Sequence, residues 1–165
     1  MADLHQCTVA ELKAMLTKAE LAAVPVVVLG LTIGEGGITP AQQEQVDAWL
    51  EDKLAACTDR VVSAVNECER NPQIAFGVLK VPSACRYTAL VLARHAVISA
   101  IPAQSNTLEG SSRAAEYQNA VADLAKLASC ELSVNDYEDS EDPDIIGGGG
   151  SVALVNPQPA QDWAW

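Results

Sequence analysis

The chain has 165 residues, the usual size of one globular domain, so we expect one folded core with tails. Apolar residues make up 49% and charged residues 19%, which suffices for a packed core and argues against global disorder. Ten basic residues against 22 acidic ones give a net charge of −12. This disfavours sequence-specific DNA binding, because a phosphate-binding face needs clustered lysine and arginine.

The sequence predicts a soluble protein that is made in a reducing cytoplasm. Residues 1–6 show no basic segment followed by an apolar stretch, so we expect no secretory signal. The most apolar run, residues 21–33, is broken by Pro25 and Gly30 and is shorter than the roughly 20 residues of a membrane-spanning helix, so we expect no membrane partner. An odd number of widely spaced cysteines favours reduced thiols over a disulfide framework. The cysteines are Cys7, Cys57, Cys68, Cys85 and Cys130.

The first forty residues predict a short helix, an extended segment and a turn. Thr8 and Glu11 form a capping-box pattern, in which each side chain accepts a hydrogen bond from the backbone amide of the other residue. Apolar residues then recur at helical spacing and predict a helix over about 9–20. The β-branched residues of 25–33 favour an extended buried segment, and the glycine-rich residues 34–37 favour a turn.

A long amphipathic helix is predicted over about 40–70. Thr39 can cap it, and Pro40 fits the first helical position, where its missing N–H leaves no hydrogen bond unmade. Asn71 precedes Pro72, which disfavours a helical backbone at Asn71 and so ends the helix. The apolar residues step by three or four and form a single stripe. They are Val46, Leu50, Leu54, Cys57, Val61, Val65 and Cys68.

Two further helices lead to an all-α prediction. A helix that starts at Pro82 or Ser83 and runs to about Ile98 is apolar on most sides, which predicts a central position in the core. The Ser111–Ser112 pair caps a fourth helix over about 112–130, whose apolar residues again step by three or four. The expected fold is a small bundle of about four helices.

The character of the chain changes after this helical domain, which we place at residues 1–132. Residues 131–144 hold seven acidic and no basic residues, over half of the net charge, and glycines 147–150 follow. We therefore expect a solvated acidic and glycine-rich linker over 133–150. An extended interaction arm is expected over 151–165. Its candidate contact residues are Val152, Leu154, Val155, Trp163 and Trp165.

The two tryptophans are the main argument for the arm. Exposed on an acidic tail, Trp163 and Trp165 would promote aggregation, whereas tryptophan is enriched among the residues that anchor protein interfaces. The strand-like residues 152–155 could add a strand to the sheet edge of a neighbouring protein. In the alternative, both indoles fold back on the chain's own bundle.

No pattern indicates a metal, a cofactor or a catalytic centre. Zinc sites pair their ligands closely, as in C-x-x-C, and we interpret Cys57 and Cys68, on one helix face, as structural residues. Residues 139–144 lack the glycine and the terminal glutamate of a calcium-binding loop. Cys85 and His95 lie about 15 Å apart along one predicted helix, at ~1.5 Å per residue, which is too far for a thiol–imidazole pair.

Residues 39–133 carry a diffuse set of helix motifs. The Val81–Pro82 turn precedes a helix with Leu-Ala-Arg-His ending at His95, and a later helix reads Arg-x-x-x-Tyr from Arg113 to Tyr117. Together with a Leu-Ser exit at Leu132, these motifs resemble the head–tail connector, or neck adaptor, proteins of Mu-like tailed phages. His95 stands where the family usually has an aromatic residue. The family-motif positions are Arg94, His95, Arg113 and Tyr117.

The resemblance implies a virion structural protein without enzymatic activity or cofactor. Such subunits form a homo-oligomeric ring, expected to be dodecameric, in the virion neck. The ring lies between the portal protein and the stopper or tail-terminator protein, completes the head and extends the DNA channel. Double-stranded DNA would pass through it without sequence-specific binding, and a net-negative subunit suits that task because it repels the phosphates.

Two other functions stay open. The charge of −12 would suit an acidic DNA mimic or another small helical module that binds a host protein, although seven carboxylates crowd one segment rather than a rigid face. Salt-sensitive binding to a basic DNA-handling protein would indicate that function. An enzyme using Cys85 or His95 would need a thiol of lowered pKa, which rapid selective alkylation would reveal.

Overall fold

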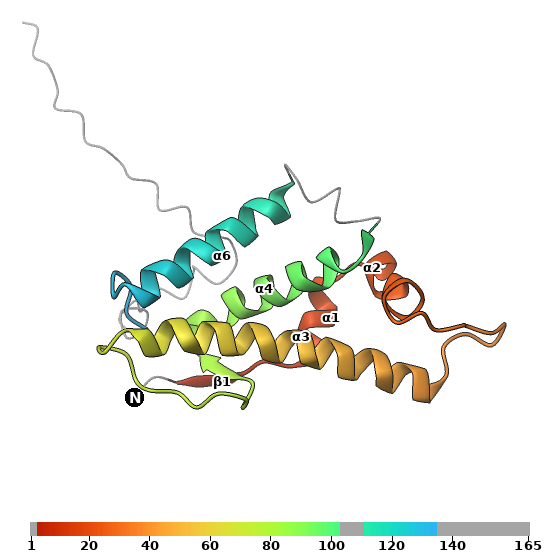
Figure 1. The fold of residues 1–165 in the computed structure, drawn as a ribbon, viewed down its shortest axis with the longest axis horizontal. Helices are drawn as coiled ribbons and strands as arrows, with labels where there is room; N and C mark the ends of the chain where they lie inside the picture. Colours follow the sequence, from red (N-terminus) through yellow and green to blue (C-terminus); the bar gives the residue numbers. More distant parts are fainter. Residues whose placement is uncertain (1–2, 103–110, 135–165) are drawn as a thin grey trace, which may run out of the picture.

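The computed structural model describes residues 3–102 and 111–134, and this part of the chain is mostly helical, as the sequence predicted (Figure 1). The predicted linker therefore falls almost entirely outside the described residues. The same holds for the whole predicted arm, with Val152, Leu154, Val155, Trp163 and Trp165.

Two short helices replace the single helix predicted over 9–20. The first, α1 (Val9–Met15), starts at the predicted capping box but ends at Leu16, whose backbone is extended at φ −95° and ψ 146°. Thr17 then forms a second capping box and starts α2 (Lys18–Ala23). Because a capping residue needs an extended backbone, the chain cannot continue one helix through this point.

The segment predicted as extended over 25–33 begins instead with a π-helical turn, η1 (Val24–Val28). The turn is closed by the N–H of Leu29, which donates to the Val24 carbonyl oxygen at 3.0 Å. Only Val24 and Pro25 of this turn are buried. The predicted turn at 34–37 is confirmed, since Gly37 has a positive φ of 82° and donates its N–H to Gly34.

The longest helix, α3 (Pro40–Glu67), follows the prediction closely. The Thr39 N–H donates to the side-chain oxygen of Gln42 at 2.9 Å, and the Gln42 N–H donates back to the Thr39 hydroxyl at 3.3 Å. The helix ends before the predicted limit at 70, because Cys68 already has an extended backbone (φ −91°, ψ 115°). Its predicted apolar stripe lies against the core.

A small antiparallel sheet was not predicted. The strands β1 (Leu4–Gln6) and β2 (Lys80–Pro82) pair with His5 opposite Val81. Each strand has three residues, too few to show an alternating pattern in the sequence. The sheet brings the N-terminal segment beneath α3 and α4 and anchors it there (Figure 1).

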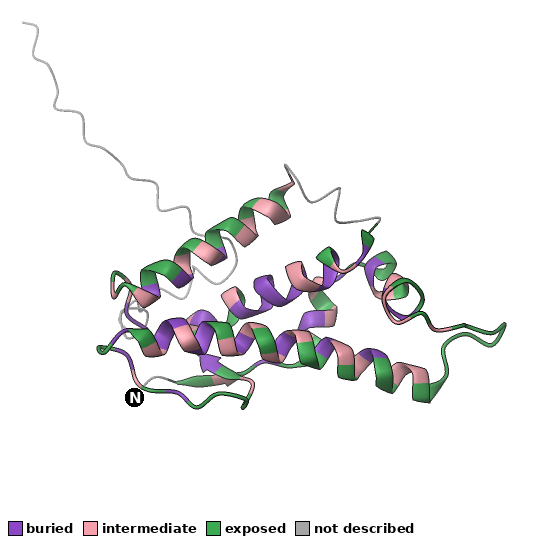
Figure 2. Cartoon of the chain, in the orientation of Figure 1, coloured by how far each residue is buried: buried purple, intermediate pink, exposed green. Residues whose placement is uncertain are grey.

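Two helices pack on α3 to form the core. A 3-10 turn, η2 (Ser83–Cys85), leads into α4 (Arg86–Ser99), and α6 (Ser112–Ala128) begins at the predicted cap Ser111. The helices α3, α4 and α6 contact one another in pairs. Figure 2 shows their buried residues on the facing sides, with α4 buried over most of its surface, as its apolar composition predicted. Among the described helices, none combines the length and apolar character needed to cross a bilayer.

The prediction of five reduced thiols is wrong for one pair, because Cys68 and Cys130 form a disulfide. They lie 62 residues apart in the sequence, but the ends of α3 and α6 meet, and their Cα atoms are 5.2 Å apart. Cys68 also does not belong to the helix, as it is the residue that ends α3. Cys7, Cys57 and Cys85 are free, as expected.

Candidate functional site

Three of the four family-motif positions meet where α4 and α6 face each other, and the fourth, Arg113, joins α6 to α2. Arg94 and His95 lie on α4, and Arg113 and Tyr117 lie on α6. All four side chains are engaged in contacts within the subunit. We call these four residues, with their partners Glu20 and Glu116, the α4–α6 cluster.

The centre of the cluster is a stack of two rings. The rings of His95 and Tyr117 lie 3.6 Å apart between centroids and 13° from parallel. The Ser99 hydroxyl lies 3.3 Å from His95 Nδ1, one turn further along α4. Burial, and then the charge of the adjacent Arg94, lower the pKa of His95 below its ordinary value. His95 therefore fills the place of a flat neutral ring between two helices.

Arg94 holds α6 through an ion pair. Its side chain is only 11% exposed, and its guanidinium donates to the carboxylate of Glu116, the residue next to Tyr117 on α6. An arginine this deeply buried needs such a partner, since removing a charge from water is unfavourable unless it is paired. The pair fixes the position of α6 along α4.

Arg113 ties α6 to α2. It donates to the carboxylate of Glu20, whose side chain is 5% exposed. Burial alone raises the pKa of Glu20, but hydrogen bonds from the Thr17 N–H and the Arg113 guanidinium outweigh it and lower the pKa below its ordinary value. Glu20 is the member of the cluster that the sequence analysis missed. The pattern Thr-x-x-Glu from Thr17 to Glu20 was the signal that could have found it.

A second ionic cluster joins α1 to the start of α4. Glu11 accepts from the Thr8 N–H at 2.9 Å and from the Arg86 guanidinium, and it lies 3.1 Å from His5 Nε2. Partial burial would raise the pKa of Glu11, but these hydrogen bonds lower it to about 2. The predicted capping box thus also joins β1 and α4 to α1.

The free thiols of the described residues are those of a packed core. Burial raises the pKa of Cys85 to about 12 and that of Cys7 to about 11. An activated nucleophile needs the opposite shift, since the thiolate is the reactive form. Within residues 3–102 and 111–134, no group of three or more cysteine, histidine and acidic side chains could hold a metal ion.

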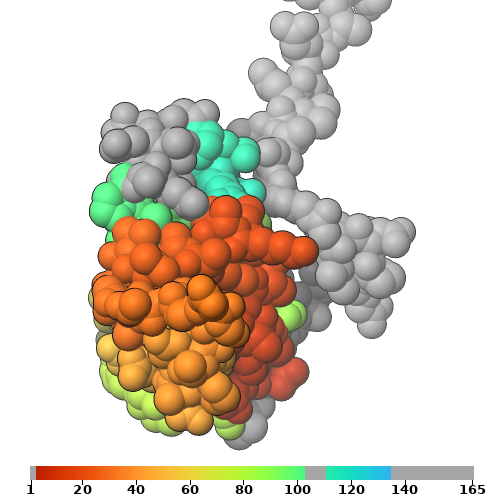
Figure 3. Space-filling view, turned by 90° about the vertical axis from the view of Figure 1, so that its right-hand side faces the viewer, coloured from red at the N-terminus to blue at the C-terminus, as the bar shows by residue number. Residues whose placement is uncertain are grey.

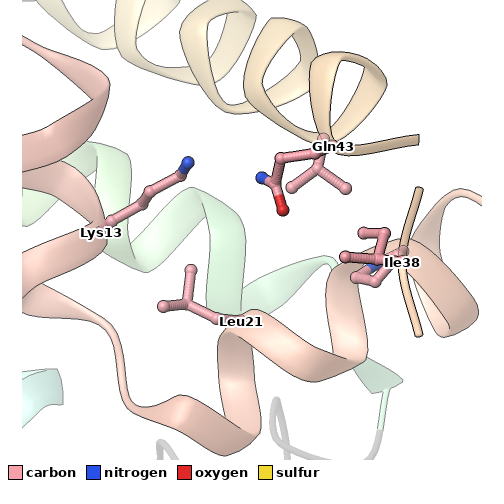
Figure 4. Close-up of a pocket in the computed structure, with 6 residues that line it drawn as sticks. Lys13, Leu21, Ile38 and Gln43 are labelled. Atoms are coloured by element: carbon pink, nitrogen blue, oxygen red, sulfur yellow. The ribbon is translucent and has the colours of Figure 1, made fainter. Parts of the chain in front are cut away.

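A shallow hollow of about 190 Å³ lies between η1 and the first turns of α3 (Figure 4). Its lining is mostly apolar, with Leu21 and Ile38 on two sides and Gln43 above. Lys13 is its basic residue and forms an ion pair with Asp47 at 2.6 Å. The hollow therefore offers a ligand little free charge and no set of converging polar groups.

The comparisons with known proteins add no relative. No protein-family model matches the sequence, and none of the curated proteins or solved structures compared with the chain matches it. The function must therefore be argued from the residues themselves. Within the described part, those residues form helix-to-helix contacts rather than a reactive centre.

Proposed function

We propose that the chain is a structural subunit of a phage head–tail connector, one copy in a homo-oligomeric ring between the portal and the stopper or tail-terminator protein. The proposal is carried by one observation: the motif positions that resemble the connector family all make contacts between helices, since Arg94, His95 and Tyr117 join α4 to α6 and Arg113 joins α6 to α2. A family motif that preserves the shape of a subunit is expected to consist of residues that make contacts between its helices. The ring is proposed to be dodecameric and to carry no enzymatic activity.

The charge on α3 supports a role beside DNA. Glu44, Glu51 and Asp52 are exposed on neighbouring positions around the helix, and none of them forms an ion pair with a described basic residue. Carboxylates on a channel wall repel phosphates, so DNA can pass without binding. We propose that this side of α3 faces the channel.

The C-terminal residues complete the proposal. Residues 1–132 would form the helical bundle, 133–150 the acidic linker and 151–165 an arm that contacts the portal or the adjoining neck protein. The arm's contact residues would be Val152, Leu154, Val155, Trp163 and Trp165, because burying two indoles against a partner is strongly favourable. Repetition around a ring would multiply that contact.

The test is the mass of the purified full-length chain by native mass spectrometry, alone and with a candidate portal protein. A ring mass of twelve subunits, or a complex with the portal, is expected. The Trp163→Ala/Trp165→Ala variant should lose the portal complex, whereas Tyr87→Ala, an exposed aromatic residue far from the arm in sequence, should keep it. A chain that stays monomeric and does not bind the portal, intact or without residues 145–165, contradicts the proposal.

The same acidic side of α3 keeps a DNA mimic as the second candidate, now on a rigid helix rather than on the tail. Its charge density argues against that function. With Asp59, the acidic side of α3 carries four carboxylates over sixteen residues, roughly one per 6 Å at ~1.5 Å per residue, whereas DNA carries about one charge per 1.7 Å. Salt-sensitive binding to a basic DNA-handling protein, without ring formation, would favour the mimic instead.

A further inference from the structure

The last described residues of the chain are fastened to the end of α3 by an unusually dense set of bonds. Cys130 is joined to Cys68 by the disulfide, and its carbonyl oxygen accepts from the Arg70 guanidinium. Cys68 is fully buried, whereas Cys130 is partly exposed. We call residues 68–71 and 130–134 the clasp.

Asn71 is the second fastening of the clasp. Its side-chain oxygen accepts from the Val134 N–H at 3.1 Å and from the Ser133 hydroxyl at 3.3 Å. Its side-chain nitrogen donates to the Val65 carbonyl oxygen at 3.2 Å, back on α3. Asn71, Ser133 and Val134 are all buried. The clasp therefore fixes residues 130–134, the last part of the chain that the structure describes.

The chain leaves α6 through a left-handed turn at Cys130, whose φ is 61°. Hydrogen bonds of the helix end hold this turn: the Cys130 N–H donates to the Leu127 carbonyl oxygen at 3.3 Å, and the Glu131 and Leu132 N–H groups donate to that of Lys126 at 2.9 and 3.1 Å. The disulfide and Arg70 join this turn to the end of α3. Without the disulfide, the covalent link between the two helix ends is lost, and the hydrogen bonds of Ser133 and Val134 to Asn71 weaken with it.

We propose that Cys68 and Cys130 form a redox-controlled lock that fixes the exit of the C-terminal residues. A chain made in a reducing cytoplasm carries two thiols here, and the lock closes when the chain meets a low-molecular-weight disulfide such as glutathione disulfide. The lock does not depend on the connector proposal. If both hold, subunits assemble with the clasp reduced, and the clasp closes after release from the host.

The closing reaction is thiol–disulfide exchange. The accessible Cys130 thiol loses a proton, and its thiolate attacks one sulfur of glutathione disulfide, forming a mixed disulfide and expelling one glutathione thiolate, which takes up a proton. The Cys68 thiol loses a proton in turn, and its thiolate attacks the Cys130 sulfur and expels the second glutathione. Two protein thiols are oxidised, one glutathione disulfide is reduced to two glutathiones, and no other reactant is needed.

The test compares the full-length chain after treatment with glutathione disulfide and after reduction with dithiothreitol. Alkylation under denaturing conditions, read by mass, should count three free thiols in the first sample and five in the second. Hydrogen exchange of the amides of residues 129–134 should become about tenfold faster, or more, in the reduced sample. The melting temperature should fall by roughly 10 °C, because a cross-link across 62 residues restricts the unfolded chain.

Variants separate the lock from general effects of thiol chemistry. Cys130→Ser should behave as the reduced chain under both treatments, whereas Cys57→Ser, a free cysteine on α3, should keep the full difference between the treatments. Five alkylated thiols after oxidation, a disulfide between chains, or unchanged exchange at 129–134 after reduction would each overturn the lock. None of these results depends on whether the chain forms a ring, so failure of the lock and failure of the connector proposal are distinguishable.

Discussion

The two ends of α3 differ in the kind of residue that they bury. At the C-terminal end, the clasp buries the polar residues Asn71 and Ser133. At the N-terminal end, shown facing the viewer in Figure 3, the most apolar run of the sequence lies largely on the surface, and Val27 is 53% exposed. Residue hydropathy alone would have assigned these two regions the other way round.

The difference follows from what each end is packed against. The clasp lies between α3 and α6, and every buried side-chain nitrogen and oxygen among the described residues has a hydrogen-bond partner. Such groups can be buried with little loss, because their bonds to water are replaced. The π-helical turn η1 instead covers α3 on one side only, so Val24 is buried while Val26 and Val27 face outward. Burial is decided by the number of neighbouring layers and by completed hydrogen bonds.

The largest expected effect contrasts a core leucine with the exposed valine. Leu54→Ala should lower the free energy of unfolding by about 3 kcal/mol, since Leu54 is fully buried on α3 and its loss leaves a cavity. Val27→Ala should change it by less than about 0.5 kcal/mol. Urea unfolding of the purified variants measures both values. Equal losses would show that 24–28 is packed in the chain's own core and would remove the contrast between the two ends.

The next effect compares two amide side chains, one at each end of α3. Asn71→Ala should lower the free energy of unfolding by about 2 kcal/mol, because it leaves the buried Val134 N–H and Val65 carbonyl without their hydrogen-bond partner. Gln42→Ala removes bonds to Thr39 and to the Thr32 carbonyl that are exposed to water, and should cost about 1 kcal/mol or less. Urea unfolding again measures both. A Gln42 variant as unstable as the Asn71 variant would contradict the view that only the C-terminal end is tightly fastened.

The sequence predicted best what depends on near neighbours. The capping box of Thr8 with Glu11 and the cap at Thr39 were predicted correctly, because both partners lie within three residues. The box of Thr17 with Glu20 was equally local and was passed over in favour of one longer helix. Pro72 predicted an end of α3 near residue 70, a few residues beyond its actual end at Glu67. Nothing nearby indicated that Asn71, beside Pro72, binds residues 62 and 63 positions away.

The contacts that were not predicted are those between residues far apart in the sequence. The disulfide joins positions 62 residues apart, and β1 pairs with a strand more than 70 residues later. Neither has a local pattern, because each exists only after α3, α4 and α6 have packed. For the candidate site, Arg94, His95, Arg113 and Tyr117 were selected by resemblance. Glu20 had a local signal in its capping box with Thr17, but its pairing with Arg113, like that of Glu116 with Arg94, could be identified only in the folded chain.

A third effect tests the bond that ties the loosely packed end to α6. Arg113→Met should lower the free energy of unfolding by about 1–2 kcal/mol at pH 7, because it leaves the buried Glu20 ionised beside a neutral side chain. In the wild type, the pKa of Glu20 lies below its ordinary value, so its contribution to stability is present above about pH 4.3 and is lost as the pH falls through the folded-state pKa. The difference between the two proteins should therefore shrink in acid.

Urea unfolding at pH 7 and at pH 3 measures this change. Lys126→Met is the matched control, since Lys126 pairs with Asp123 at 3.7 Å on the exposed side of the same helix. This substitution should change the free energy of unfolding by less than about 0.5 kcal/mol. A difference for Arg113→Met that is equally large at both pH values would mean that the arginine acts through its apolar stem. The ionic connection between α2 and α6 would then be of no importance.

The smallest effect concerns the ring stack between α4 and α6. A double-mutant cycle of His95→Ala and Tyr117→Ala should give a coupling energy of about 1 kcal/mol or less.

The sharper variant is His95→Phe, which keeps a flat ring and removes the proton-binding group. Because the folded-state pKa of His95 is below its ordinary value near 6.5, the unfolded chain binds the proton more readily, and the wild type should lose stability as the pH falls from 7 through that range. Measured by urea unfolding, the His95→Phe variant should lose less stability than the wild type over the same pH range. Parallel pH profiles would show that the imidazole is not confined between the helices, and the stack would then not hold α6 in place.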